Sequence, residues 1–244
     1  LSEKLNVRQA GLRVGFSCAD RATRSAPNNP STLLRYVEAL FLFIAYLFGS
    51  IPAGVLISRL YRLDIRQVGS GNIGATNVQR ALGWGPGLFV LFFDALKGTS
   101  VVWAVRSLGL SDPWVTACGF STVLGHNYSV FLGFKGGKGV ATSLGTVTCI
   151  APDVGLFSFL VAATNISLTR YVSAGSLLGA LSATLYAFFS PHRPDIQISC
   201  TAVTLLMFWT HRDNLTRLQK GVERRFGEKI PAVPATDSEK KEPT

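Results

Sequence analysis

The strongest constraint on the fold of this chain is a series of apolar stretches separated by short polar segments. The stretches cover residues 36–57, 86–106, 113–133, 140–151, 154–168, 171–190 and 196–210. Backbone groups find no water in the hydrocarbon of a bilayer, so an apolar stretch of about 20 residues crosses it as a helix. The pattern predicts an all-α, polytopic membrane bundle. Because several stretches are short, six spans is the cautious count and seven is the prediction.

The charge content agrees with a membrane protein. Only 16% of the residues are charged, against about 25% in soluble domains. A net charge of +10 would otherwise suggest nucleic acid as a partner. Most of the basic residues, however, lie in short loops and near both ends of the chain rather than along one face. We therefore expect contact with anionic membrane lipid and no nucleic-acid partner.

The loop charges also predict an orientation. With seven spans, one side of the membrane collects most of the basic residues, whereas the other has only Arg106 and Arg193. Short basic loops stay in the cytoplasm. The C-terminus is therefore predicted to be cytoplasmic, together with Arg59, Arg62, Arg66, Arg80, Lys135, Lys138, Arg170 and residues 212–229.

The two ends of the chain differ from its apolar region. Residues 1–32 form a basic extension typical of a disordered arm or an organellar targeting segment, and residues 231–244 form a polar tail that we expect to be disordered. Residues 33–230 are the predicted membrane domain. The four cysteines are widely scattered, a pattern that supports neither a disulfide framework nor a metal site.

Three polar blocks, rich in glycine or in cations, interrupt the apolar stretches at residues 69–80, 134–142 and 211–214. Glycines expose backbone N–H groups, and Arg or Lys supplies positive charge, so together they bind phosphate or carboxylate. The predicted topology places all three blocks on the cytoplasmic side. They therefore indicate chemistry on an anionic substrate at the membrane surface.

The first block has Gly69, Gly71 and Gly74 in the spacing of a dinucleotide-binding loop. It follows a predicted membrane span rather than a β-strand, so we reject a dinucleotide-binding fold. What remains is a flexible backbone that can surround an oxyanion, with Arg80 placed to grip phosphate. The candidate hydrogen-bonding groups are Ser70, Asn72, Thr76 and Asn77.

The second block contains Lys135, Gly136, Gly137, Lys138 and Gly139. It is not a Walker A loop, because residue 139 is Gly where that motif has Ser or Thr. The interleaved glycines favour a phosphate cradle made of backbone N–H groups and lysine. The alternative is a basic anchor whose lysines reach lipid headgroups.

Ionisable residues also occur inside the predicted spans. Asp94 and Lys97 lie three residues apart and share one helical face. They predict a structural ion pair at least as readily as a catalytic pair, because buried charges in a membrane are normally paired. His126 and Asn127 either join neighbouring helices or lie near a site.

Further polar residues follow near the predicted cytoplasmic side. Ser173 either donates to a phosphate or caps a helix. His211 and Asn214 are one helical turn apart and share a polar face. Glu223 is expected to pair with a nearby Arg or Lys of the basic C-terminal segment.

Six motifs follow one another along residues 36–230: Gly49-Ser50-Ile51-Pro52, residues 69–80, Asp94-x-x-Lys97-Gly98, Gly125-His126, residues 134–142, and His211-Arg-x-Asn214 with Glu223. In order and spacing they resemble the bacterial-type glycerol-3-phosphate acyltransferases that use acyl phosphate, the PlsY family. The resemblance implies a seven-helix membrane enzyme of phospholipid biosynthesis. It implies transfer of a fatty acyl group from acyl phosphate to the 1-hydroxyl of sn-glycerol 3-phosphate, giving lysophosphatidate and phosphate.

The resemblance and the chemistry of the polar blocks together give the expected roles of individual residues. The residues expected to be catalytic are Ser70, Arg80, Lys138, His211 and Asn214. Those expected to bind substrate are Gly69, Gly71, Asn72, Asn77, Lys135, Gly136, Gly137, Gly139 and Ser173. Glu223, Asp94 and Lys97 are expected to be structural. The implied location is a bacterial-type plasma membrane, with an organellar membrane as the alternative because of residues 1–32.

The expected chemistry needs no strong protein nucleophile, because acyl phosphate is a mixed anhydride with a good leaving group. Positioning and charge stabilisation suffice, and we expect no metal or organic cofactor. The hydroxyl proton can pass to His211 or to a substrate phosphate. A small transporter of phosphate or another anion is the alternative function, but transporters bind near the midplane and this chain gathers its cations at one side.

Overall fold

The computed structural model describes residues 30–228, with side chains from residue 35 onward. Most of the predicted N-terminal extension and the predicted polar tail therefore lie outside the described residues. The described part contains helices and loops but no strand, as the predicted all-α fold requires. Its helices are α2 (Pro30–Gly49), α3 (Ala53–Leu60), η1 (Ile65–Gln67), α4 (Ala75–Leu82), α5 (Trp84–Ser107), α6 (Asp112–Asn127), η2 (Val130–Leu132), α7 (Val140–Ile150), α8 (Pro152–Thr169), α9 (Val172–Phe189), α10 (Pro194–Thr210) and α11 (Arg212–Gln219).

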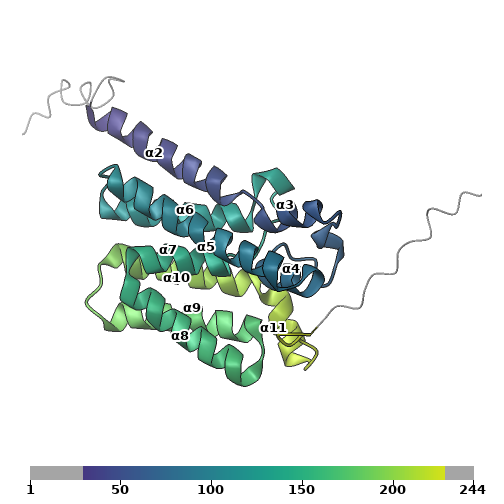
Figure 1. Ribbon diagram of the computed structural model, residues 1–244. Coiled ribbons are helices and arrows are strands. Elements are labelled where there is room, and N and C mark those ends of the chain that lie inside the picture. Colours follow the sequence, from purple (N-terminus) through teal and green to yellow (C-terminus); the bar gives the residue numbers. More distant parts are fainter. Residues whose placement is uncertain (1–29, 229–244) are drawn as a thin grey trace, which may run out of the picture. The chain divides into compact units, whose positions relative to one another are not determined.

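The short helix α7 lies in the middle of the bundle. It packs against α5 and α6 on one side and against α8 on the other, while α8 and α9 pair with each other. Helix α10 lies between α9 and α6. The short helices α3, α4 and α11 gather at one end of this arrangement (Figure 1). That end carries the polar blocks, so the fold brings them together.

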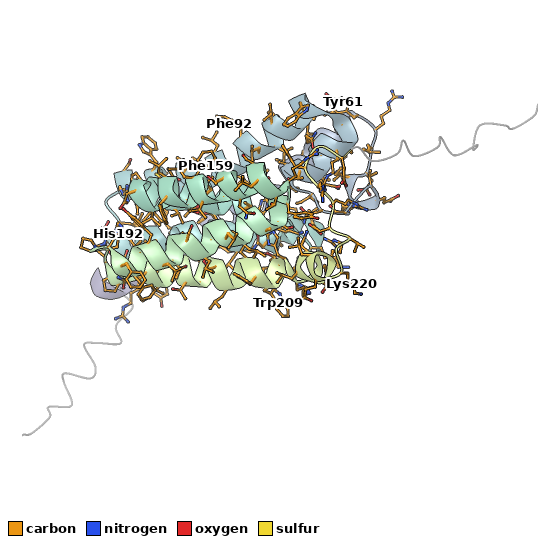
Figure 2. The ribbon with its side chains drawn as sticks, turned by 90° about the horizontal axis from the view of Figure 1, so that it is seen from below. Tyr61, Phe92, Phe159, His192, Trp209 and Lys220 are labelled. Atoms are coloured by element: carbon orange, nitrogen blue, oxygen red, sulfur yellow. The ribbon has the colours of Figure 1, made fainter. Side chains whose placement is uncertain are left out.

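The bundle exposes large apolar side chains on its outer surface and buries charged residues beside its apolar core, as expected for a protein surrounded by lipid. The side chains of Phe92 and Leu205 are 69% and 66% exposed, whereas Asp94 and Lys97 are only 3% and 1% exposed. Figure 2 shows Phe92 and Trp209 at the outer surface of the helices. Among the described residues, three stretches are long and apolar enough to cross a membrane: Arg35–Leu60, Trp84–Ser107 and Val172–Phe189. The count of seven spans stays a prediction.

The first apolar stretch is broken, contrary to the single span predicted over residues 36–57. Helix α2 ends at Gly49, and α3 begins only at Ala53. Pro52 explains the break, because it has no N–H and disfavours helical geometry at the preceding residue. The Nζ of Lys97 donates to the carbonyl oxygens of Gly49 and Ile51 at 3.2 and 3.0 Å. A side chain from α5 therefore satisfies the Gly49 carbonyl that the break leaves free, and it gives the Ile51 carbonyl a second donor beside the N–H of Ala53.

The stretch predicted over residues 113–133 is also shorter than expected as a helix. Helix α6 ends at Asn127, and the chain then turns through η2. In this turn Ser129 is fully buried, and its hydroxyl donates to the carbonyl oxygen of Ser50 at 2.6 Å. The end of α6 is thereby tied to the break between α2 and α3.

Replacing Ser129 by Ala tests this tie. It leaves the buried Ser50 carbonyl without its donor, so we expect a loss of about 1–3 kcal/mol in the free energy of unfolding. Ser107→Ala is the matched control, because the Ser107 hydroxyl is exposed and donates only within its own helix; its loss should stay below about 0.5 kcal/mol. Thermal unfolding in detergent measures both. Equal stability of the two variants would contradict the role of this hydrogen bond.

Candidate functional site

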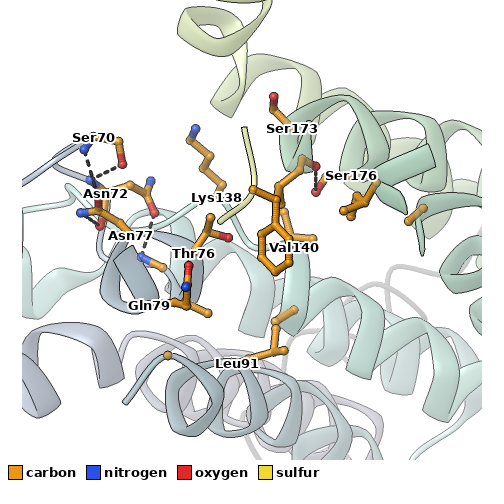
Figure 3. Close-up of a pocket in the computed structure, with 18 of the residues that line it drawn as sticks. Ser70, Asn72, Thr76, Asn77, Gln79, Leu91, Lys138, Val140, Ser173 and Ser176 are labelled. Carbon is orange, nitrogen blue, oxygen red and sulfur yellow. Dashed lines mark hydrogen bonds between the residues drawn. The ribbon is translucent and has the colours of Figure 1, made fainter. Parts of the chain in front are cut away.

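A cavity of about 470 Å³ lies where the polar blocks meet. Residues from all of these blocks line it, including Ser70, Asn72, Arg80, Lys138, Gly139, His211 and Asn214. Figure 3 shows Lys138 between the loop that carries Ser70 and Asn72 and the first turns of α9, which carry Ser173 and Ser176. Segments far apart in the sequence thus share one site.

Asn77 shapes the loop of the first block. Its side chain is 2% exposed, and its Oδ1 accepts from the backbone N–H of Ser70 at 3.0 Å. Its Nδ2 donates to the carbonyl oxygens of Val68 and Asn72, both at 2.9 Å. The amide of Asn77 is therefore occupied by the loop itself, and it sets where Ser70 and Asn72 lie.

The glycine loop of the second block uses its backbone differently from the predicted phosphate cradle. The N–H groups of Gly136 and Gly137 donate to the carbonyl oxygens of Asn127 and His126, each at 3.0 Å. These donors are consequently engaged with the end of α6. Lys138 is the residue of this loop that brings charge to the cavity, where its ammonium group contacts the Oδ1 of Asn214.

Glu223 connects several residues around the cavity. Its Oε1 accepts from the hydroxyl of Ser173 at 2.8 Å and from the Nδ2 of Asn214 at 2.6 Å. Its Oε2 pairs with the Nε of Arg217 at 2.7 Å. Burial alone would raise the pKa of Glu223, but the bonds from Asn214, Arg217 and Ser173 outweigh it and lower the pKa. The carboxylate thus joins α9, α11 and the C-terminal segment.

Positive charge dominates the polar end of the cavity. Arg80, Lys138, Arg217 and Arg224 all line it. Among the described residues, Arg217 is paired with Glu223, whereas the other three cations form no ion pair with a carboxylate. The buried Nε of Arg80 has no hydrogen-bond partner in the described region. This end of the cavity therefore has donors and charge in reserve for an anion.

Burial lowers the pKa of two cavity residues. It lowers the pKa of Lys138 to about 8, with a further contribution from the Arg217 cation. Burial, followed by the nearby Lys138 cation, lowers the pKa of His211 to about 4. The Nδ1 of His211 lies 2.8 Å from the carbonyl oxygen of Met207. Because a carbonyl only accepts, Nδ1 carries the proton, and Nε2 of the neutral ring is an acceptor.

The other end of the cavity is apolar. It is formed by Leu88 and Leu91 of α5, Leu144 of α7, and Phe159 and Ile166 of α8. Leu91 and Phe159 are 47% and 50% exposed on the outer surface of the bundle. The apolar wall therefore continues from the cavity to the surface that faces lipid. The site has one end suited to anions and another suited to hydrocarbon.

The structure brings most of the predicted site residues to the cavity. Ser70, Asn72, Asn77, Arg80, Lys138, Gly139, Ser173, His211 and Asn214 line it, as do Asp94 and Glu223. Gly69, Gly71, Lys135, Gly136, Gly137 and Lys97 do not line it. Gly69 and Gly71 have positive φ values of 64° and 70° and turn the loop, and Lys135 is exposed. Direct contact of these residues with a substrate is thus not supported by their positions.

Several cavity residues were absent from the sequence prediction. Arg217 and Arg224 belong to the basic C-terminal segment, which the sequence indicated only as a cytoplasmic run of charge. Trp84 and Phe226 form an edge-to-face contact with ring centroids 5.5 Å apart. The sequence feature that could have indicated Arg217 and Arg224 was the high content of Arg beyond residue 211. This feature does not distinguish arginines that line a cavity from arginines exposed to solvent.

Replacing Glu223 by Gln tests the network around this carboxylate. A group with a lowered pKa stabilises the fold above its unfolded value, near 4.5, and this stabilisation is lost as the pH falls through the folded value. The melting temperature of Glu223→Gln should therefore lie below that of the wild type at pH 7, and the gap should narrow below pH 4.5. The exposed Glu228→Gln is the control, with no gap expected. A gap that is independent of pH would contradict the network.

Comparison with known proteins agrees with this site. A family model described as glycerol-3-phosphate acyltransferase matches residues 39–221. The glycerol-3-phosphate acyltransferase of Thermus thermophilus is 55% identical over 192 residues, which cover 78% of this chain and 96% of the relative. The protein of the same name from Aquifex aeolicus is 48% identical over 193 residues, which cover 78% of this chain and 100% of the relative.

Solved structures show the same fold. PlsY, described as an integral membrane glycerol 3-phosphate acyltransferase, superposes in its glycerol 3-phosphate form with a TM-score of 0.75 at 45% identity, over 78% of this chain and 96% of that chain. Its lysophosphatidic acid form gives a TM-score of 0.73 at 44% identity, with the same coverage. These relatives are acyltransferases, which favours that interpretation over an anion transporter. The chain belongs to the glycerol-3-phosphate acyltransferase family and is an integral membrane protein.

Proposed function

We propose that this protein transfers a fatty acyl group from acyl phosphate to the 1-hydroxyl of sn-glycerol 3-phosphate in the cavity. The observation that carries the proposal is the division of the cavity into a cationic end and an apolar end. Acyl phosphate has the matching division, because it joins a phosphate to a hydrocarbon chain. Its acyl chain would lie along α5 and α8, where the apolar wall reaches the outer surface.

The cationic end has groups for the phosphates of both substrates. Lys138 and Arg80 supply charge close to Ser70 and Asn72, and the first residues of α4 line the same side. N–H groups at the start of a helix favour anions. We assign the phosphate of glycerol 3-phosphate to this region, with Asn214 orienting Lys138. Arg217 and Arg224 extend the positive surface toward the second phosphate.

The transfer itself requires one bond to form and one to break. The 1-hydroxyl oxygen attacks the acyl carbonyl carbon, the bond from that carbon to the phosphate oxygen breaks, and the electron pair leaves with phosphate. The cations stabilise the charge on the carbonyl oxygen and on the departing phosphate. With a pKa of about 4, His211 is a weak base, whereas a phosphate monoester has a second pKa near 6. We therefore assign the proton of the 1-hydroxyl to a substrate phosphate. The Nε2 of His211 is assigned an orienting role, in which it accepts a hydrogen bond from the 2-hydroxyl of glycerol 3-phosphate.

The proposed location is a bacterial-type plasma membrane, with the cavity on its cytoplasmic side. The support for this side is the excess of Arg and Lys in the predicted cytoplasmic loops. Placement in an organellar membrane stays the alternative prediction tied to residues 1–32.

A donor assay tests the proposed reaction. The purified full chain should form lysophosphatidate and phosphate in equal amounts from acyl phosphate and glycerol 3-phosphate, and should form no product from acyl-coenzyme A. Arg80→Ala and Lys138→Ala should each reduce the rate by about 100-fold or more, since each removes a charge from the reacting region. Arg193→Ala, at the far end of the bundle, is the control and should retain the full rate. Product from acyl-coenzyme A alone would overturn the proposal.

The low pKa of Lys138 predicts a pH dependence. A lysine with a pKa near 8 is charged below that pH and neutral above it, so kcat/KM for glycerol 3-phosphate should fall above pH 8, approaching tenfold per pH unit. Lys138→Arg keeps its charge at these pH values, so its kcat/KM should not fall above pH 8, even though its rate is lower than that of the wild type. Initial rates between about pH 6.5 and 9.5, corrected for spontaneous hydrolysis of the donor, measure both. If kcat/KM falls in the same way above pH 8 in the wild type and in Lys138→Arg, the titrating group is not Lys138.

A further inference from the structure

Asp94, Lys97 and His126 form a buried polar cluster beside the cavity. Their side chains are 3%, 1% and 5% exposed. The Nζ of Lys97 lies 2.9 Å from the Oδ1 of Asp94 and 3.1 Å from the Nδ1 of His126. The same Nδ1 lies 3.5 Å from the Oδ1 of Asp94. The cluster therefore joins one face of α5 to the last turn of α6.

The cluster reaches two further segments. On one side, Lys97 donates to the carbonyl oxygens of Gly49 and Ile51 at the break between α2 and α3. On the other side, the ring of His126 lies directly against Gly137, where a Cβ would collide with its Nε2. The backbone carbonyl of His126 also accepts from the N–H of Gly137 at 3.0 Å. His126 thus holds the glycine loop by both its ring and its backbone.

Lys138 follows Gly137 directly, and Gly139 continues the chain with a left-handed φ of 76°. The placement of Gly137 therefore decides where the lysine leaves the loop and whether it reaches Asn214. The bonds from Lys97 to Gly49 and Ile51 account for a buried donor at this position, but they do not account for the His126 ring, which lies against Gly137. Two members of the cluster, Asp94 and His126, also border the cavity.

We propose that Asp94, Lys97 and His126 are positioning residues that fix the glycine loop on α6 and thereby hold Lys138 at the anion site. They act through Gly137 and not on the reacting atoms. The ion pair fixes the orientation of the His126 ring, and the ring leaves space for glycine alone at residue 137. The effect on substrate rests on the proposed function, whereas the effect on the loop does not.

Two variants test the proposal in the full chain, purified in detergent. Asp94→Asn/Lys97→Met removes both charges at once, so no buried charge is left unpaired. His126→Gln removes the ring that packs against Gly137. Thr204→Val is the matched control, because Thr204 is also buried and its hydroxyl pairs with Thr184 between α9 and α10, away from the loop. Hydrogen exchange of residues 134–139 and the Kd for glycerol 3-phosphate are measured for each, with and without Lys138→Ala.

The proposal predicts exchange at residues 134–139 at least about tenfold faster in both test variants, with unchanged exchange in α9 and α10. Each test variant should raise the Kd for glycerol 3-phosphate about tenfold relative to the wild type. In a protein that already carries Lys138→Ala, the same change should raise the Kd by less than about twofold, because the two changes act through one contact. Thr204→Val should leave both quantities unchanged. Unaltered loop exchange, or faster exchange throughout the bundle, would overturn the positioning role. A wild type that binds no glycerol 3-phosphate would instead overturn the proposed function, while the exchange data still decide on the loop.

Discussion

The buried ammonium group of Lys97 is the interaction on which the arrangement of the polar end depends. A membrane interior offers no water to carbonyls freed by a broken helix, so the protein must supply its own donor. Lys97 supplies it to Gly49 and adds a second donor to Ile51, and Asp94 balances its charge. Because α5 carries both residues, the break between α2 and α3 is held against the centre of the bundle. The end of α6 joins the same point through His126.

A series of contacts connects the Lys97 cluster with the residues at the cationic end of the cavity. The end of α6 holds the glycine loop, the loop presents Lys138, and Lys138 contacts Asn214. Asn214 in turn donates to Glu223, which ties α9 and α11 to the C-terminal segment. Several polar residues of the cavity, Lys138, Asn214, Ser173 and Arg217, thus have another cavity residue as a partner. Such mutual contacts hold the charged groups in place.

The sequence allowed a good prediction of the helices and of the site's chemistry, for a physical reason. Apolar stretches and polar blocks are local patterns, and a membrane forces the first into helices and the second to the ends of those helices. The position of Pro52 alone did not distinguish a kink from a full break, because the outcome depends on Lys97, which is distant in sequence. The N–H groups of Gly136 and Gly137 were expected to face an anion. Their actual partners are carbonyls at the end of α6, a tertiary contact that residue spacing does not encode.

The partners of Glu223 illustrate the same limit. Ser173 lies 50 residues from Glu223 in sequence, so no helical spacing relates them. The expected pairing of Glu223 with a nearby cation follows from local spacing, and it is found with Arg217. Local rules therefore identified pairs within one helix or segment, whereas contacts between segments required the fold. The roles of individual cavity residues in substrate binding remain proposals built on their positions.

Centrally, we propose that the polar blocks form a single anion site at the cationic end of the cavity. A structure of the protein with glycerol 3-phosphate bound tests this claim most directly. We expect phosphate density within hydrogen-bonding distance of Lys138 and Arg80, with the glycerol hydroxyls toward His211. Density at the opposite end of the bundle, beside His192 and Arg193, or binding that leaves Lys138 and Arg80 without contact to the ligand, would contradict it.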